Sequence, residues 1–587
     1  MKNYEFGNYL FELRRNSKIS QRILARELGL SDKTVSKWEN GTAMPKSSDL
    51  IRIARFFGIS VDKLLSCGAD NGNQNAAASV ISPFEISKGC DHVKESENRQ
   101  LLENLISPAG KTTGNYMCTF HQQAVVAKKL GLKGRKASHL RDALNSETLF
   151  GEENYYHPIS RELRSNLIFL LDDGWDVPYG TPNDPDHLAM FGSVEPDEEK
   201  FAEFGNTALE RLCGISKKVK ELGYAGLGLW IAPQQVGETE YDPYAARLYW
   251  EERAKMSQQA GVLYWKVDWG MHASDVEYHR MISEAMQKYA PDVMVEHSVG
   301  ELPYTQLHEE GFVAIRQAKV KKQMAFCDAY RTYDISQPFD DVCTLQRSSE
   351  ALAQTDISNP KGLGLVNAEG QSYIAAALGL TIGIMLYDKE TQACLNWHRL
   401  APPFSVHGST FVCSEQLLED SMFMDTEPGR WLRGAGRFLT ETAPAIMARN
   451  CPLPEVKKLG EHQPFVAAAK NPVTSAYSIA TFRRTIDPNP KMICLADVTA
   501  HEVDICANIG VFGYFNSLTL EFTTAIPENC RILVQDLIAE TPMDVTDQVK
   551  IDGSKLMLDG KLLRYWGKSG RGDQDTSDPS LVMKLSF

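Results

Sequence analysis

Two apolar runs of this chain lead directly into aspartates. Residues 167–171 lead into Asp172 and Asp173, and residues 262–265 lead into a Lys-Val-Asp sequence that ends at Asp268. Short apolar runs rich in β-branched and aromatic residues are typical of strands buried on both faces. In a barrel of parallel strands, the carboxyl ends of the strands carry the chemistry. Aspartates placed there, beside Trp and Lys, indicate a sugar site, because a carboxylate can bind hydroxyls or attack an anomeric carbon.

Polar groups follow the other predicted strands as well. Glycoside hydrolysis needs two carboxyl groups, a nucleophile and a proton donor, which a retaining enzyme holds about 5 Å apart. The chain has many carboxylates and no His/Cys cluster with metal-ligand spacing, so we expect neither a metal nor a cofactor. The further strand-end groups are His121, Trp175, Trp230, Gln234, Lys266, Glu296, His297, Asp328, Arg331 and Asp334.

The elements that must position these groups alternate between strand and helix. Amphipathic helices are predicted at residues 199–222 and 244–259, between strand-like runs. Repeated strand–helix units of this length predict a (β/α)8 TIM barrel over residues 108–450. An open doubly wound sheet is the alternative, but the sequence has no Gly-rich dinucleotide fingerprint to support it. The predicted strands are residues 115–120, 167–171, 226–231, 262–267, 293–296, 324–327 and 363–366.

The strand-end motifs resemble those of the α-galactosidase-like clan of barrel glycosidases. The matching segments are Asp-Asp-Gly-Trp at 172–175, Gly-Leu-Gly-Leu-Trp at 226–230, Lys-Val-Asp at 266–268 and Arg-Thr-Tyr-Asp-Ile at 331–335. The resemblance implies a retaining glycoside hydrolase that cleaves O-glycosidic bonds with two carboxylates. It implies Asp268 as the nucleophile, Asp334 as the acid/base, and Asp172, Asp173, Trp175, Trp230, Lys266, Glu296 and Arg331 as substrate-binding residues.

Other interpretations of these residues stay open. The interval from Arg331 to Asp334 is one residue shorter than in that clan, so other aspartates are rivals for the acid/base role. Aspartates after a strand also serve as helix caps or turn residues. Trp230 fits a core position as well as a sugar platform. The rival aspartates are Asp328 and Asp340, and Glu296 with His297 has an alternative interpretation as a polar pair.

The first 66 residues have helical periodicity and a different charge. Residues 21–27 predict a short helix, Gly29 a turn, and Ser31 the N-cap of a second helix that runs to Trp38. Two short helices joined by a turn containing Gly are typical of a helix-turn-helix. This segment carries 12 Lys/Arg against 7 Asp/Glu, a net charge of +5, whereas the remainder carries −19. The asymmetry indicates a nucleic-acid-binding head on an acidic body.

The head resembles the Cro/repressor-type helix-turn-helix family. The matching residues include Ser20-Gln21, Leu28-Gly29, Thr34-Val35-Ser36 and Trp38-Glu39-Asn40-Gly41. The resemblance implies that the second helix enters the major groove of double-stranded DNA, usually in a dimer on paired half-sites. Val35 and Trp38 are expected in the core. The implied DNA-binding residues are Gln21, Ser31, Asp32, Lys33, Thr34 and Lys37.

The rest of the chain contains a linker and a β domain. Residues 67–107 are polar and have little to bury, so we expect a flexible linker. Residues 451–587 alternate short strand-like runs with turn signals, which predicts an antiparallel β-sandwich. Asp552-Gly553 and Asp559-Gly560 are predicted hairpin turns. The chain is thus expected to be multidomain: an all-α head at 1–66, a linker, a barrel at 108–450 and a sandwich at 451–587.

Composition restricts where the protein works. The net charge of −14 argues against a body that coats nucleic acid or an anionic membrane. The twelve cysteines show no paired framework, and no apolar stretch has the length of a membrane span. We therefore expect a cytoplasmic homo-oligomer that binds a carbohydrate and DNA. A second hypothesis is a sugar-sensing transcriptional regulator whose barrel binds carbohydrate without turning it over.

The charge of the head generates the first testable prediction. Isolated residues 1–66 should bind DNA with an affinity that falls steeply with salt. Each neutralised phosphate contributes about −0.9 to the slope of log K against the logarithm of the salt concentration. Titrations at several salt concentrations measure that slope. A slope near zero would contradict a role in DNA binding.

Overall fold

The computed structural model describes most of the chain, in two compact units that are treated separately here. One unit contains the N-terminal 91 residues, and the other contains the body. The described residues are 3–16, 20–21, 24–25, 28, 30–40, 43, 45–57, 104–106, 114–153, 155–298, 312–332, 340–418, 442–458, 463–483, 495–572 and 575–587.

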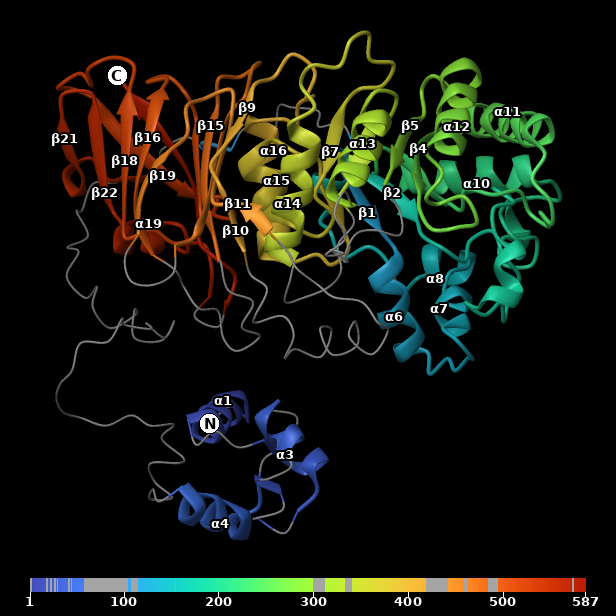
Figure 1. Ribbon diagram of the computed structural model, residues 1–587, viewed down its shortest axis with the longest axis horizontal. Coiled ribbons are helices and arrows are strands. Elements are labelled where there is room, and N and C mark those ends of the chain that lie inside the picture. The colour runs from blue at the N-terminus through green and yellow to red at the C-terminus, as the bar shows by residue number, and fades with distance from the viewer. Residues whose placement is uncertain are drawn as a thin grey trace. The chain divides into compact units, whose positions relative to one another are not determined.

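The head is a small helical unit (Figure 1). Its described helices are α1 Asn3–Asn16, α3 Asp32–Glu39 and α4 Ser47–Phe57. Ser31 caps α3, since its hydroxyl accepts a hydrogen bond from the Thr34 amide, as the sequence predicts. Val35 and Trp38 are buried with Phe6, Leu10, Leu24 and Ile53, so their predicted core positions are confirmed. Part of the helix predicted at 21–27 lies outside the described residues.

Eight parallel strands form the predicted barrel (Figure 1). They follow one another in sheet order from β1 to β7, and β8 pairs with β1 on the other side. A parallel bridge between Asn367 and Thr381 links the β7 end to the segment before β8. The strands are β1 Tyr116–Cys118, β2 Ile168–Leu171, β3 Gly226–Ile231, β4 Val262–Val267, β5 Met294–His297, β6 Ala329–Arg331, β7 Leu365–Asn367 and β8 Gly383–Ile384.

Helices follow the strands and cover the barrel. The predicted helices near 199–222 and 244–259 are observed as α10 and α11, somewhat shorter and slightly longer respectively. In the part of the chain that the structure describes, no helix combines the length and apolarity that crossing a membrane requires. The helices are α6 Phe120–Lys129, α7 Ser138–Asp142, α8 Ser146–Phe150, α9 Arg161–Arg164, α10 Ala208–Glu221, α11 Pro243–Ala260, α12 Val276–Tyr289, α13 Phe312–Met324, α14 Asp340–Leu352, α15 Ser372–Leu378 and α16 Lys389–Leu400.

The sixth strand lies later than predicted. The predicted strand at 324–327 is wrong, because Met324 ends α13 and β6 begins at Ala329. The apolar residues 324–327 belong to the end of the helix and the connection. The strand itself carries Arg331, which is buried in the barrel, so its sequence lacks the continuous apolar run that identifies the other strands.

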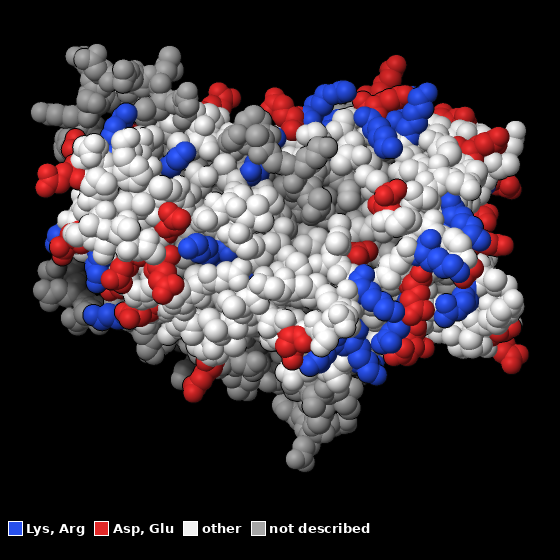
Figure 2. Space-filling model, turned by 90° about the horizontal axis from the view of Figure 1, so that it is seen from above, with Lys and Arg blue, Asp and Glu red and all other residues white. Residues whose placement is uncertain are grey.

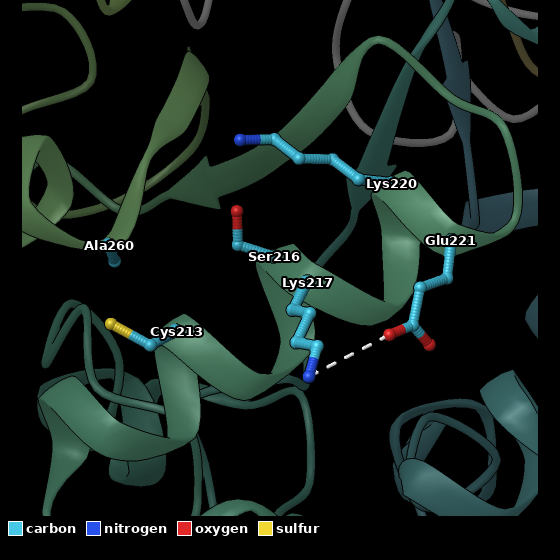
Figure 3. A pocket seen from close by; sticks show the side chains of 6 residues that line it. All are labelled: Cys213, Ser216, Lys217, Lys220, Glu221 and Ala260. Carbon is cyan, nitrogen blue, oxygen red and sulfur yellow. Dashed lines mark ion pairs between the residues drawn. The ribbon is translucent and has the colours of Figure 1, made fainter.

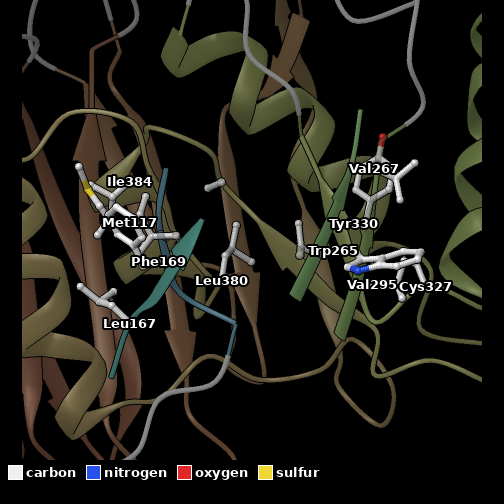
Figure 4. Packing of buried hydrophobic residues seen from close by; sticks show 14 of the residues in the cluster. Met117, Leu167, Phe169, Trp265, Val267, Val295, Cys327, Tyr330, Leu380 and Ile384 are labelled. Carbon is white, nitrogen blue, oxygen red and sulfur yellow. The ribbon is translucent and has the colours of Figure 1, made fainter. Parts of the chain in front are cut away.

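Alternate strand residues belong to two different layers. One set packs outward against the helices, including Met117, Phe169, Trp265 and Val295 (Figure 4). The other set forms a separate cluster with Tyr116, Cys118, Leu170, Trp230 and Tyr264. Since side chains alternate along a strand with a period of two, the second set faces the barrel interior.

Two β-sheets form the C-terminal part. The larger has the order β20-β19-β23-β17-β15-β14-β12-β9, and the smaller β13-β16-β18-β22-β21. Antiparallel pairs predominate, and β12–β14, β15–β17 and β16–β18 are parallel. The strands are β9 Phe411–Cys413, β12 Ile446–Arg449, β13 Glu455–Lys458, β14 Phe465–Lys470, β15 Tyr477–Phe482, β16 Ala496–Val503, β17 Ile509–Phe512, β18 Ser517–Phe522, β19 Arg531–Asp536, β20 Met543–Asp544, β21 Lys550–Asp552, β22 Lys555–Asp559 and β23 Ser580–Ser586, with a separate pair β10 Gln416–Leu418 and β11 Thr442–Pro444.

The larger sheet is buried on both faces. Val466 and Ala468 of β14 pack with the smaller sheet, whereas Phe465 and Ala467 belong to the core that includes the barrel helices. Figure 1 shows this sheet beside α15 and α16. Two strands of this sheet, β9 and β12, precede residue 451, the expected start of the domain.

The two predicted hairpin turns have different outcomes. Asp552 ends β21 and Gly553 begins the turn to the antiparallel strand β22, so a hairpin turn forms here as predicted. The turn predicted at Asp559-Gly560 is wrong, because Asp559 instead caps helix α19 Gly560–Trp566 by accepting a hydrogen bond from the Lys561 amide. Asp favours both positions for the same reason, since its short side chain bonds nearby backbone amides.

The packing of β14 generates a stability prediction. Ala467→Leu should lower the free energy of unfolding by about 1–3 kcal/mol, because Ala467 is fully buried between the larger sheet and the barrel helices. Lys550→Leu, at an exposed position of β21, serves as the control and should change it by less than about 0.5 kcal/mol. Chemical denaturation measures both, and equal effects would contradict the assigned packing.

Candidate functional site

Five charged residues of the predicted site lie at the carboxyl ends of the barrel strands. Lys266 continues the inward alternation of Tyr264 on β4, and Asp268 follows one more step along it. Asp172 comes directly after β2, Glu296 lies in β5 and Arg331 ends β6. Each of these charged residues is at most 8% exposed. Such burial is costly for charges that are unpaired, so their partners define the site.

Lys266 connects carboxylates from two strands. Its ammonium lies 3.0 Å from Asp172 Oδ2 and 2.9 Å from Glu369 Oε1. Cys118 Sγ donates to the same Asp172 oxygen at 3.0 Å. Burial lowers the pKa of Lys266, but Asp172 and Glu369 outweigh it, so the pKa is held well above its ordinary value. Lys266 is therefore a fixed cation.

Arg331 connects three carboxylates. Its Nη2 lies 2.8 Å from Asp268 Oδ1, its Nη1 lies 2.8 Å from Glu369 Oε2, and its Nε lies 3.2 Å from Glu296 Oε1. The carboxylates come from the ends of β4, β7 and β5, so one guanidinium links three strands. The planar donor fork of arginine suits this arrangement, which a lysine could not reproduce.

Asp268 is oriented through both of its oxygens. Arg331 donates to Oδ1, and the indole Nε1 of Trp230 donates to Oδ2 at 2.8 Å. Trp175 Nε1 in turn donates to the carbonyl oxygen of Trp230 at 3.0 Å. Both tryptophans are fully buried, so they contact the site through these hydrogen bonds rather than through an exposed ring. Trp269, which is half-buried, packs against Trp230 with ring centroids 5.1 Å apart.

Asp173 has a partner of its own. Its carboxylate forms an ion pair with Arg141, which belongs to α7. Gly174 follows with φ of +109°, and a Cβ there would lie 2.7 Å from Arg141 Cβ, so only glycine allows this close approach. Burial raises the pKa of Asp173 to about 7, against the opposing effect of Arg141.

Glu296 is held among tyrosines. Tyr264 donates to Oε2 at 2.7 Å and Tyr116 donates to Oε1 at 3.1 Å. Burial raises its pKa to about 7, which Arg331 opposes only in part. Glu369 contrasts with it: burial raises its pKa as well, but Arg331 and Lys266 outweigh this and lower the pKa to about 2. Two buried carboxylates of one site therefore differ greatly in acidity.

Of the three acid/base candidates, Asp328 alone has a described side chain. Asp334 lies outside the described residues, and so does the side chain of Asp340. Asp328 precedes β6 rather than following it, and its carboxylate accepts hydrogen bonds from the amides of Val295 and Leu363. Asp328 therefore has a structural role at the opposite end of the strand.

The remaining predicted groups surround the cluster or lie behind it. His121 is exposed, and burial lowers its pKa while Glu369 and Asp172 act to raise it. His297 is buried and bonds Ser283 at 2.8 Å, away from Glu296. Gln234 donates to the carbonyl oxygens of Leu188 and Phe191. No group of three or more His, Cys, Asp or Glu side chains among the residues described has a geometry that could hold a metal ion.

Sequence reasoning missed several members of the site. Glu369 follows β7 by two residues, and Arg141 and Tyr264 come from a helix and a strand interior. Glu369 was detectable in principle, because it continues the inward alternation of Asn367 past the strand end. Arg141 carries no such signal, since its approach to Asp173 depends on the fold of the loop after β2.

In the head, α3 presents the predicted DNA-binding residues. Ser31, Lys33 and Lys37 are exposed, and Thr34 is half-buried. Gln21 donates to Glu39 Oε2 at 2.7 Å, and Arg14 bonds both oxygens of the same carboxylate. The side chain of Asp32 lies outside the described residues. Gln21 is thus held by a hydrogen bond to Glu39, and the ion pair between Glu39 and Arg14 connects α3 to α1.

A pocket on the outside of the barrel is unrelated to this cluster (Figure 3). It is lined by residues of α10 and the end of α11, and Lys217 forms an ion pair with Glu221 at 3.9 Å. None of the predicted site residues lines it. On the face of the molecule shown in Figure 2, basic and acidic side chains are interspersed.

Comparisons with known proteins identify the head. The helix-turn-helix family matches residues 10–64. The HTH-type transcriptional activator BcrR of Enterococcus faecalis is 39% identical over 62 residues, which is 11% of this chain and 30% of that protein. The match thus spans about a third of the relative's length. Residues 10–64 of this chain thus match the helix-turn-helix family, and the barrel body follows them in the same chain.

Solved glycosidases are similar to the body. A β-L-arabinopyranosidase of Geobacillus stearothermophilus is 10% identical, with a TM-score of 0.34, covering 81% of this chain and 97% of that one. The α-galactosidase of Saccharomyces cerevisiae is 10% identical, with a TM-score of 0.31, covering 82% and 97%. At these values the function of the barrel must be argued from its own residues.

The raised pKa of Glu296 generates a prediction about stability and pH. Folded Glu296 keeps its proton up to about pH 7, whereas the ordinary carboxyl loses it near 4.5. The folded state then binds more protons in this window, so stability falls as the pH rises from about 4.5 to about 7. Glu296→Gln should flatten that fall, and melting temperatures across the window measure it. The exposed Glu203→Gln is the control; an unchanged pH profile in Glu296→Gln would contradict the assignment.

Proposed function

We propose that the barrel is a retaining glycoside hydrolase of the α-galactosidase type, carried by a chain that also binds DNA through its head. The observation that carries the proposal is the environment of Asp268. A buried carboxylate at the end of β4 is oriented through both oxygens, by Arg331 and Trp230, and the buried cation Lys266 precedes it by two residues. This is the arrangement that a nucleophile needs, because each oxygen keeps a second lone pair for the reacting carbon.

Asp268 would attack the anomeric carbon of the glycoside. The bond from that carbon to the leaving oxygen breaks, the acid/base gives the leaving oxygen its proton, and a glycosyl ester forms on Asp268. Water, deprotonated by the same acid/base, then attacks the anomeric carbon and releases the sugar with Asp268 restored. The net result is hydrolysis with retention of configuration.

We assign the acid/base role to Asp334 from its place in the sequence. It follows β6 by three residues in the sequence, after Arg331, and the carboxyl ends of the strands carry the chemistry in a barrel of parallel strands. The amide partners of Asp328, at the amino end of β6, support this choice over Asp328. The interval from Arg331 to Asp334 is one residue shorter than the corresponding interval in the α-galactosidase-like clan.

The other buried charges would bind the sugar. Asp172 and Lys266 form an ion pair whose remaining lone pairs and protons suit vicinal hydroxyls, and Asp173 with Arg141 offers a second such pair. Arg331, which pairs with both Asp268 and Glu296, would together with Glu296 contact the substituent next to the anomeric carbon. Trp175 and Trp230 act by holding Asp268.

The head would place this body on DNA. Lys33 and Lys37 are exposed on α3 and suit phosphate contacts, and Ser31, Thr34 and Asp32 lie near the start of the helix that would enter the major groove. Gln21 is held by Glu39 at the start of the preceding helix. Such heads usually act as dimers, so we propose a cytoplasmic homo-oligomer.

The alternative is a regulator that senses a sugar without hydrolysing it. In this alternative the buried charges bind the carbohydrate and the head reads the operator, with no covalent step. The two functions differ in turnover alone, so one kinetic experiment separates them.

The role of Asp268 generates the next prediction. Asp268→Asn should lower kcat by roughly 10³-fold or more on a panel of nitrophenyl α- and β-glycosides, because an amide does not attack the anomeric carbon. Asp552→Asn, in an exposed turn of the smaller sheet, is the matched control and should keep the wild-type rate. Release of nitrophenol measures both.

Two results would contradict parts of the proposal. Undiminished hydrolysis by Asp268→Asn would remove Asp268 as the nucleophile. A wild-type protein that hydrolyses none of the glycosides, but is thermally stabilised by one of the free sugars, would be the sensing regulator.

A further inference from the structure

Glu369 is the one site carboxylate so far without a role. It lies two residues beyond β7, and its side chain is 9% exposed. The backbone around it is fixed on both sides, since the Ala368 amide donates to Thr381 and the Gly370 amide donates to Gly383. Both acceptors belong to the segment that forms β8. Glu369 is thus attached to the rigid part of the barrel rather than to a free loop.

Both oxygens of Glu369 are engaged by cations. Oε1 lies 2.9 Å from Lys266, and Oε2 lies 2.8 Å from Arg331. The Tyr116 hydroxyl adds a longer hydrogen bond to Oε1 at 3.4 Å. Among the residues that the structure describes, Glu369 is the carboxylate that forms ion pairs with both Lys266 and Arg331.

This junction matters because the two cations come from strands that are not neighbours. Lys266 lies in β4 and Arg331 in β6, with β5 between them. Both side chains are long, with several rotatable bonds whose freedom must be lost for a fixed geometry. Lys266 contacts Asp172, and Arg331 contacts Asp268. A rigid bridge between the cations therefore fixes the sugar-binding pair relative to the proposed nucleophile.

We propose that Glu369 is a positioning residue of this site, which holds Lys266 and Arg331 in place by bridging them with one carboxylate. This inference rests on the proposed function for its kinetic consequences. Glu369 itself would not transfer a proton, because the two cations keep it ionised. Its contribution is geometric: a displacement of about 1 Å at the reacting groups costs up to about 10²-fold in rate.

The decisive variant is Glu369→Ala, which removes the equivalent of an acetate ion and keeps Cβ. We expect kcat/KM to fall about 100-fold. Added acetate should rebind between Lys266 and Arg331 and restore at least about tenfold, as expected for hydrogen bonds to charged groups. Chloride at the same ionic strength should restore nothing. A side chain that merely supports the fold would not be replaced by a free anion.

Two further variants complete the test. Glu369→Gln keeps the shape but presents an amide N–H₂ group to one of the cations, so it should also lose activity and should not respond to acetate. Glu203→Ala, at an exposed position, is the control and should behave as wild type. If Glu369→Ala does not fold, the Gln variant decides, and wild-type kcat/KM in that variant overturns the proposal.

A second measurement does not depend on catalysis. Acetate should raise the melting temperature of Glu369→Ala more than that of wild type or Glu203→Ala, because only that variant has the vacated anion position. Wild-type protein without turnover would refute the proposed function, and the melting temperatures would then decide this inference. The inference is overturned by wild-type kcat/KM in a folded Glu369→Ala, or by a lost rate and a melting temperature that acetate leaves unchanged.

Discussion

The buried guanidinium of Arg331 is the interaction on which the candidate site depends. A charge this deeply buried is tolerated only with partners of opposite sign, and Arg331 lies within ion-pair distance of three carboxyl groups, from the ends of β4, β5 and β7. Removing any one of them leaves the others with an altered charge balance. The arrangement also explains why Glu296 and Glu369 differ so much in acidity: Glu369 shares a second cation, Lys266, and Glu296 does not lie within ion-pair distance of it. The barrel supplies the rigid strand ends that such a network needs.

The period-two alternation of strand side chains accounts for most of what the sequence could predict. Residues 167–171 and 262–265 are apolar on both faces, which identifies β2 and β4, and the aspartates that follow must then lie at the carboxyl edge. The same reasoning failed for β6, because the interior residue there is Arg331 and not an apolar one. Charged residues that form ion pairs inside a barrel interrupt the apolar run by which a buried strand is recognised in a sequence. Arg141 could not be predicted for a different reason, since it reaches Asp173 from a helix between the first two strands.

The C-terminal sheets show the same limit of local patterns. Asp552 and Asp559 are each followed by glycine, yet one forms a hairpin turn and the other caps a helix. What separates them is the element that follows: β22 pairs back onto β21 after Asp552, whereas α19 begins after Asp559. By contrast, Ser31 was identifiable as a helix cap because capping is decided by the residues next to it. A contact between residues far apart in the sequence also fixes the end of the predicted linker, because the Leu105 amide donates to Gln535 of β19 at 2.8 Å.

The account claims above all that Asp268 forms a covalent bond to a sugar. The most direct measurement is the mass of the intact protein after incubation with an activated, fluorinated α-galactosyl donor that glycosylates a nucleophile faster than the ester is hydrolysed. The account predicts a single added glycosyl group, located by peptide mapping on Asp268 and absent from Asp268→Asn. A protein that releases sugar without any adduct, or whose adduct lies on another carboxylate, would contradict it.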